Sequence, residues 1–333
     1  MVPVMKGIAG KIATGLIALL VLVTFIRVAI IVRRVLRSDD GGSLTAPSFV
    51  ADTASADTAR TFVVPDTLLG RSGALRFAAM SAREAQDLPD FLAAYGDSIL
   101  LGPRTLALEV HGQPFMLFMI RPFAHKRGDM VGPYRIGLFP AERWMMADNY
   151  LNPDGFLEVT PSNIETMLSA HFRLSDFLTH DQASIWPKFV LVEERLIDKL
   201  ELVLSELARE GIDTRRAVVL SGFRAPYYND ARIDEGAARA SRHQFGDAAD
   251  LIIDADSDGR MDDLNRDGRR TLGDLAAIGD AVAAVERRYP ELTGGLGTYA
   301  AMGPSGPFAH IDVRGTSARW ERAQASRPAP RRP

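Results

Sequence analysis

Apolar and polar positions are distributed differently in successive parts of the chain, and the first part is almost entirely apolar. Residues 12–32 contain a single charge, Arg27, and a run of this length is enough for a helix to cross a bilayer. Residues 38–67 are rich in Ala, Ser, Thr, Asp and Gly and poor in large apolar side chains, which is typical of a flexible linker. We therefore expect a transmembrane anchor over residues 1–37 and a linker over residues 38–67.

Short strand-like runs come next along the chain. The segments TLALEVHG and PFMLFMIRPF, bounded by Gly and Pro, predict a small β-rich domain over residues 68–155. From Lys188 to Glu210 apolar residues recur at helical spacing until Gly211, and this pattern predicts a core helix.

The last third combines strands and a helix with polar loops. RAVVLSGF and FAHIDVRG predict strands, and residues 272–288 predict a helix. This order is typical of an α+β domain whose small antiparallel sheet is flanked by helices. We expect that domain over residues 156–325, with a loop insertion at 254–274 and a disordered tail at 326–333.

Composition narrows the possible functions. The 333 residues carry a net charge of −3 and have no large basic tract beyond the first forty positions, which argues against nucleic-acid binding. Cysteine is absent, and this excludes disulfides, thiolate nucleophiles and cysteine zinc sites. Histidines and carboxylates are therefore the candidates for chemistry.

Two histidines and an aspartate stand where strands are expected. In SRHQFGDAADLIIDADSDG, His243 precedes a strand that carries Asp250, and His310 lies in FAHIDVRG. Because side chains repeat every second residue, Asp312 and Arg314 share a strand face with His310. Two imidazoles and one carboxylate form a known catalytic zinc set that leaves a fourth position for water.

The segments around these residues carry a resemblance. SGFRAPYYN, SRHQFGDAAD, GGLGTY and FAHIDVRG with Trp320 resemble, in order and spacing, the zinc D-Ala-D-Ala carboxypeptidase and murein endopeptidase family, whose fold is shared with the hedgehog signalling domain. The resemblance covers about residues 161–320. It implies that His243, Asp250 and His310 are zinc ligands, and that Arg224 binds substrate and steadies the developing oxyanion.

One position departs from this family. Many members have a Glu or Asp three residues before the last histidine as general base, but Pro307 stands there in this chain. The nearest acid on the same strand face is Asp312. We expect Asp312 to act either as the base or as a partner that orients His310.

An aspartate-rich stretch after Asp250 predicts calcium binding. The stretch can be aligned with the calcium-loop pattern in two ways, which we call registers. The first register places oxygen ligands at Asp263, Asn265, Asp267, the Arg269 carbonyl and Asp274, with Gly268 at the sixth position and Thr271 at the ninth. A second, poorer register begins at Asp254 and includes Asp256 and Asp258. Calcium would then stiffen the connection between the ligand strand and the helix that follows.

Three functions remain open from the sequence. The first is a zinc metallopeptidase that hydrolyses D,D- or L,D-peptide bonds in bacterial peptidoglycan, anchored in the inner membrane by one helix with the bulk of the chain in the periplasm. The second is a non-catalytic module, stabilised by zinc and calcium, that binds cell wall or protein. The third is a cytoplasmic, membrane-tethered protein, because Arg33, Arg34 and Arg37 follow the apolar run and positive residues favour the cytoplasmic side.

Overall fold

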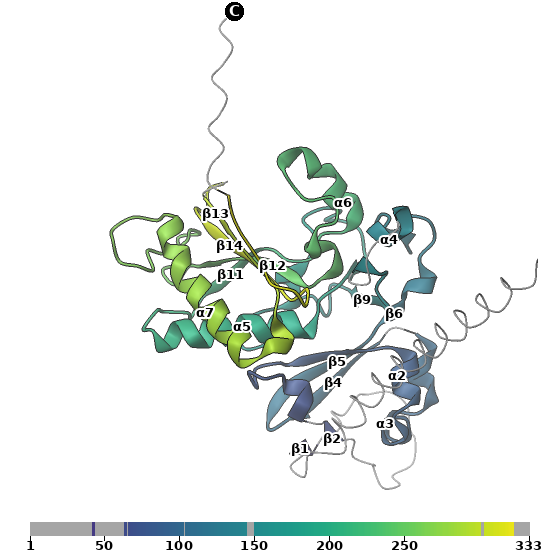
Figure 1. The fold of residues 1–333 in the computed structure, drawn as a ribbon. Coiled ribbons are helices and arrows are strands. Elements are labelled where there is room, and N and C mark those ends of the chain that lie inside the picture. The colour runs from purple at the N-terminus through teal and green to yellow at the C-terminus, as the bar shows by residue number, and fades with distance from the viewer. Residues whose placement is uncertain are drawn as a thin grey trace, which may run out of the picture.

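The computed structural model describes residues 66–102, 104–144, 150–300 and 303–322, and two short strands, β1 Gly42–Ser43 and β2 Val63–Val64, that pair with each other. The expected membrane anchor, the tail and most of the linker lie outside the described residues. In the part of the chain that is described, no helix is long and apolar enough to cross a membrane. The fold is mixed α/β, with several small sheets and few helices (Figure 1).

The first part of the described chain forms a three-stranded sheet with two short helices. The strands β4 and β5 form an antiparallel hairpin, and β3 pairs with β5 in parallel. The helices were not predicted from the sequence; Ser81 and Glu84 cap the first of them reciprocally. The elements are β3 Phe77–Met80, α2 Ala82–Gln86, α3 Pro89–Tyr95, β4 Arg104–Val110 and β5 Gln113–Met119.

A second three-stranded sheet joins this part to the rest of the chain. Strand β9 (Gly155–Val159) lies between β6 (Arg121–Pro122) and β10 (Lys188–Val190). The boundary that we expected after residue 155 falls inside β9, whose partners come from either side of it. The expected helix from Lys188 was wrong at its start, because a short apolar run such as FVLV fits a buried strand as well as a helix.

The largest sheet has five strands in the order β11-β12-β14-β13-β15. They are β11 Ala217–Ser221, β12 Ala248–Ile253, β13 Gly295–Tyr299, β14 Phe308–Asp312 and β15 Ala318–Arg322. Three pairings are antiparallel as predicted, but β13 and β15 are parallel. The reason is topological: β12 and β13 occupy both edges of β14, so the chain that reverses after β14 pairs with the free edge of β13 and runs in the same direction as β13.

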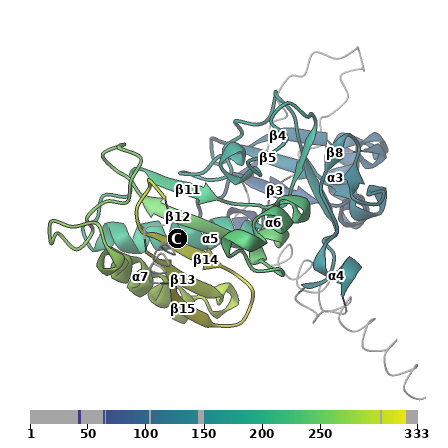
Figure 2. The same cartoon turned by 90° about the horizontal axis from the view of Figure 1, so that it is seen from above.

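Two helices cover one face of this sheet (Figures 1 and 2). Helix α5 (Glu194–Arg209) packs on α7 (Leu275–Arg288), and α7 contacts β13 and β14. The apolar side chains that this face contributes to the main core are Leu251, Ile253, Leu296, Ala309 and Ile311. Their alternation leaves the opposite face, as predicted, to Asp250 and His310.

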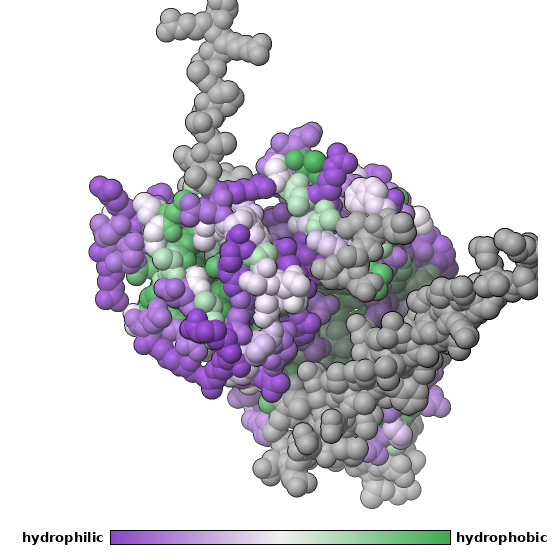
Figure 3. Space-filling view, viewed as in Figure 1, coloured by the Kyte–Doolittle hydropathy of each residue, from purple (hydrophilic) through white to green (hydrophobic). Residues whose placement is uncertain are grey.

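Helix α5 also attaches the first part of the chain. The Asp198 carboxylate is buried and accepts hydrogen bonds from the backbone N–H groups of Arg71 and Ser72, both at 2.8 Å. The Glu194 carboxylate accepts another from Ala79 at 2.8 Å. The apolar side chains of α5, such as Leu196, Leu200 and Leu207, are buried. Hydrophilic residues are spread over much of the coloured surface in Figure 3, with smaller hydrophobic areas between them.

The remaining elements are short. They are η1 Asp66–Leu69, η2 Asp97–Leu101, η3 Phe123–His125, β7 Met130–Val131, β8 Tyr134–Arg135, α4 Pro140–Arg143, η5 Leu174–Phe177, α6 Pro226–Ala231, η6 Ile233–Glu235, η7 Arg242–Phe245, η8 Leu272–Asp274 and η9 Pro290–Leu292.

Candidate metal centre

Strand register brings one row of side chains together across the large sheet. Ser221 is paired with Asp250, Asp250 with His310, His310 with Gly297, and Gly297 with Trp320. Cross-strand partners point to the same face of a sheet. Asp250 and His310, sixty residues apart in the chain, are therefore neighbours on the face opposite α5 and α7.

His243 reaches the same place from the short helix η7, just before β12. Its Nδ1 lies 2.7 Å from the carbonyl oxygen of Gly222. Gly222 packs so closely on η5 that a Cβ atom would lie 2.6 Å from the Cα of Phe177, and only glycine fits there. The close packing fixes the carbonyl that orients the His243 ring.

Three ligand atoms converge at the centre of the site. His243 Nε2 lies 3.1 Å from His310 Nδ1 and 3.2 Å from Asp250 Oδ1, and His310 Nδ1 lies 3.0 Å from that same oxygen. All three residues are buried, with at most 6 % of their surface exposed. The structure therefore brings together the three residues that the sequence singled out as metal ligands.

The outer partners decide which ring nitrogens carry protons. The Gly222 carbonyl can only accept, so His243 carries its proton on Nδ1. His310 Nε2 lies 3.2 Å from Asp312 Oδ2, and an ionised carboxylate also only accepts. In both neutral rings the inner nitrogen then presents a lone pair to the other ring and to the Asp250 oxygen. Three buried lone pairs at this distance repel one another unless a metal cation, or a proton on one of the rings, lies between them.

The distances fit a metal ion. Tetrahedral zinc with ligands at about 2.0–2.2 Å sets its ligand atoms about 3.3–3.6 Å apart, close to the 3.0–3.2 Å observed here. The outer hydrogen bonds to Gly222 and Asp312 are of the kind that orient metal-bound histidines. The buried group of His243, Asp250 and His310 could thus bind a metal ion.

The pKa values follow from burial and from these contacts. Burial, aided by the nearby Arg224 guanidinium, lowers the pKa of His243 to about 4 against the opposing effect of Asp250. Burial alone would lower the pKa of His310, but its hydrogen bonds with Asp250 and Asp312 outweigh burial and raise it. His243 is therefore neutral near pH 7, as a metal ligand must be, whereas a proton competes with a metal at His310.

Arg224 holds the Asp250 carboxylate from the other side. Its Nη2 donates to Asp250 Oδ2 at 2.6 Å and its Nε donates to the Ser221 hydroxyl at 2.8 Å. The Arg224 backbone N–H donates to the His243 carbonyl at 3.0 Å. Within the described chain Nη1 has no partner, so it is the part of the guanidinium that can contact a ligand.

Asp312 lies behind His310. It is fully buried, it accepts from the Gly295 N–H at 2.7 Å, and it pairs with Arg314. Burial would raise the pKa of Asp312, but the hydrogen bonds from His310 and Arg314 hold it well below its usual range. Of the two roles expected for Asp312, this position favours the orientation of His310.

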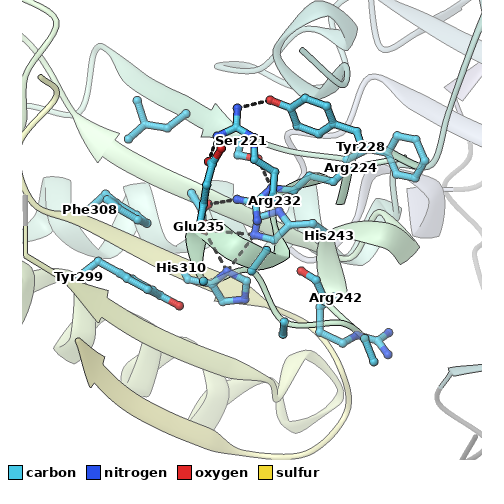
Figure 4. Close-up of a pocket in the computed structure, with 18 of the residues that line it drawn as sticks. Ser221, Arg224, Tyr228, Arg232, Glu235, Arg242, His243, Tyr299, Phe308 and His310 are labelled. Atoms are coloured by element: carbon cyan, nitrogen blue, oxygen red, sulfur yellow. Dashed lines mark hydrogen bonds and ion pairs between the residues drawn. The ribbon is translucent and has the colours of Figure 1, made fainter. Parts of the chain in front are cut away.

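His243, Asp250 and His310, together called the metal group, lie in the wall of an open cavity of about 760 Å³ (Figure 4). Sheet residues line one side, and residues of α6 and η6 such as Tyr228 and Glu235 line another. His180, for which no role was predicted, also lines this cavity, and so do the aromatic residues Tyr299 and Trp320. A cavity of this size is typical of small-molecule and peptide sites.

The acidic insertion gathers a different set of carboxylates from the one preferred on sequence. Asp254, Asp256 and Asp262 place one carboxylate oxygen each within 4.8 Å of one another. Sequence reasoning missed Asp262, although it occupies the ninth position of the second register. Arg270 pairs with Asp258 at 2.5 Å and with Asp256 at 3.3 Å.

The residues of the first register bond mainly to their own loop. The Asp263 carboxylate accepts from the N–H groups of Asp267 at 3.1 Å and Gly268 at 2.7 Å. The buried Asp274 carboxylate accepts from the N–H groups of Asn265 at 3.3 Å and Thr271 at 2.6 Å. Asp267 accepts from the Arg269 N–H at 2.8 Å.

Comparison with protein-family models, with curated proteins and with solved structures finds no match. The geometry of the site therefore carries the functional argument together with the sequence motifs.

The position of Asp312 leads to a prediction about metal affinity. Replacement by Asn (Asp312→Asn) removes the charge behind His310 and should weaken divalent-metal binding about 10–100-fold, measured by competition with a chromophoric chelator. The matched control is Asp213→Asn, whose exposed carboxylate pairs with Arg215 and does not line the cavity. Unchanged metal affinity together with a loss of hydrolysis would instead identify Asp312 as the general base.

Proposed function

We propose that this protein is a membrane-anchored zinc peptidase that hydrolyses peptide bonds in bacterial peptidoglycan, of the D,D- or L,D-type. The observation that carries the proposal is the convergence of three buried lone-pair donors, 3.0–3.2 Å apart, in the wall of an open cavity. A structural zinc ion usually has four protein ligands, whereas a catalytic one has three and an open position.

The donor set supports zinc as the metal. Magnesium and calcium prefer sites made of oxygen ligands, while two imidazole nitrogens and one carboxylate suit zinc. When bound here, zinc would acidify a water molecule and polarise the amide carbonyl of a peptide. Elemental analysis that found stoichiometric iron in place of zinc would contradict this assignment, because ferrous oxygenases use the same set.

Arg224 would contribute charge stabilisation. Its Nε and Nη2 are held by Ser221 and Asp250, so the guanidinium is fixed before substrate arrives. A fixed cation beside a developing oxyanion stabilises the transition state without reorganisation. Nη1 is the atom that would meet the substrate.

The substrate class rests on the sequence motifs. SGFRAPYYN, SRHQFGDAAD and FAHIDVRG resemble the zinc D-Ala-D-Ala carboxypeptidase and murein endopeptidase family, and the residues that converge are those matched to its ligands. The five-stranded sheet with α5 and α7 on one face and the cavity on the other is compatible with the hedgehog-like fold that the resemblance implies.

The peptidase is tested with purified murein sacculi and the full-length protein in detergent. Zinc-loaded protein should release muropeptides, a chelator should abolish release, and added zinc should restore it. His243→Ala should lower the rate about a thousandfold or more, since the metal is worth several kcal/mol to the transition state. His125→Ala, an exposed histidine outside the cavity, is the matched control.

A specific observation keeps a second function in view. Pro307 stands where the resemblance implies a general base. A non-catalytic module stabilised by zinc and calcium needs no general base, so the proline is compatible with that function. In the same assay such a module would bind zinc and sediment with sacculi but release no fragments. That result would contradict the peptidase function and support the binding module.

We propose in addition that the acidic insertion binds calcium and supports the metal centre. Met261 of the insertion donates its N–H to the Ser305 carbonyl at 2.9 Å, and Asp262 donates its N–H to Ile253 at 2.8 Å. The insertion thus contacts the end of β12 and the loop that precedes β14, the two strands that carry Asp250 and His310.

Calcium binding predicts a thermal shift. At a hundred times Kd, calcium should stabilise the protein by about 2.7 kcal/mol and raise Tm by several degrees. Asp263→Asn with Asp267→Asn should remove this shift if the first register binds, and Asp254→Asn with Asp256→Asn if the second does. Should both double variants keep the full shift, the insertion is not the calcium site.

The proposed location is the inner membrane, with the described chain in the periplasm where peptidoglycan lies. Lys6 and Lys11 before the apolar run and the arginines after it give opposite signals. A reporter that is active only in the periplasm, fused after Pro333, should be active in cells. Activity of a cytoplasm-specific reporter instead would rule out this topology.

A further inference from the structure

A hydrogen-bonded pair of aromatic residues stands beside the metal group. Trp320 Nε1 donates to the Tyr299 hydroxyl at 2.9 Å. Tyr299 lies two residues after Gly297, the cross-strand partner of His310, so both aromatic residues and His310 belong to the same face of the sheet. All three line the cavity, and Figure 4 labels Tyr299 and His310.

Close packing fixes the pair. A Cβ atom on Gly297 would lie 2.3 Å from Trp320 Nε1, so the missing side chain allows the indole to lie across β13. The Trp320 ring centroid is 5.2 Å from that of His310. Tyr299 in turn stacks on Phe308, with centroids 4.7 Å apart and planes 4° from parallel. Tyr299 therefore has little rotational freedom and its hydroxyl has a defined position.

The Tyr299 hydroxyl proton is available to donate a hydrogen bond to a ligand. An indole N–H can only donate, so the Tyr299 oxygen must be the acceptor in this bond. The hydroxyl's own proton is then directed elsewhere, and no acceptor for it lies among the described residues. Figure 4 shows the Tyr299 hydroxyl directed to the side of the cavity where His310 lies.

We propose that Tyr299 is a catalytic residue, whose hydroxyl donates a hydrogen bond to the carbonyl oxygen of the scissile amide as negative charge develops there. This inference rests on the proposed peptidase function. It places a neutral donor opposite the Arg224 cation, with the metal group between them, so the developing oxyanion is contacted from two sides. Donors fixed in this way stabilise the transition state more than the ground state.

Other tyrosines in the cavity fit this role less well. The Tyr228 hydroxyl accepts from Arg232, whose guanidinium also pairs with Glu235 (Figure 4). The Tyr150 ring packs on Phe245 and under the Arg242 guanidinium. Tyr299 has both a rigid support and a place beside a metal-ligand side chain.

The test replaces the hydroxyl alone, with Tyr299→Phe in the full-length, zinc-loaded protein. The kcat for a defined muropeptide should fall about 10²–10³-fold, as for loss of one oxyanion donor, with KM within a few-fold of wild type. A phosphinate analogue of a dipeptide, which carries a tetrahedral centre, should bind more weakly by a similar factor, measured by calorimetry. Zinc content and affinity for the cleaved peptide product should stay unchanged.

Two variants serve as comparison. Tyr289→Phe removes a hydroxyl outside the cavity and should behave as wild type, whereas Tyr228→Phe tests the rival donor. Wild-type kcat and phosphinate affinity in Tyr299→Phe, or the full loss in Tyr228→Phe instead, would overturn the role of Tyr299 and leave the peptidase intact. If Tyr299→Phe lost its zinc, Tyr299 would support the metal site and would not be a catalytic residue. A wild-type protein that neither cleaves peptides nor binds the phosphinate would overturn the peptidase and this role together.

Discussion

The centre depends on three buried ligand atoms that need a metal cation or a shared proton between them. His243 Nε2, His310 Nδ1 and Asp250 Oδ1 face one another at 3.0–3.2 Å, and each is held from outside by a different partner: the Gly222 carbonyl, Asp312 and Arg224. Buried polar atoms are costly unless they are satisfied. The surrounding fold keeps the atoms in place, and a metal cation between them would be attracted to all three.

The sheet supplies the precision that this arrangement needs. One row of paired residues runs across the sheet from Ser221 through Asp250, His310 and Gly297 to Trp320. A one-residue slip of any of these strands would move its member of the row to the other face. Behind β14, the fully buried Lys199 of α5 donates to the Asp312 carbonyl at 2.8 Å and to Glu286 of α7 at 2.7 Å. The two helices thus support the strand that carries His310 by polar contacts as well as by packing.

Local signals predicted the strand faces of the centre, whereas the convergence of His243, Asp250 and His310 was implied by the family resemblance. The alternation in β12 and β14 predicts which face carries Asp250 and His310, and that face is confirmed. The pairing of β13 with β15 and the strand at Lys188 were missed, because period-two and apolar runs do not specify which strands pair. Asp262 was missed because the second register fails at its twelfth position, Asn265, although three of its carboxylates lie together.

Position 307, where a proline replaces the acid that the resemblance implies, lies in a loop that contacts the acidic insertion. The loop that contains Pro307 is held through the Ser305 carbonyl by Met261, a residue of the acidic insertion, and a glycine at 306 adopts the left-handed backbone that the turn requires (φ +80°). This loop serves as the link between the insertion and β14. In the cavity, the fixed hydrogen-bond donors beside His243, Asp250 and His310 are Arg224 and the Tyr299 hydroxyl. In the proposed peptidase these preorganised donors would stabilise the developing negative charge.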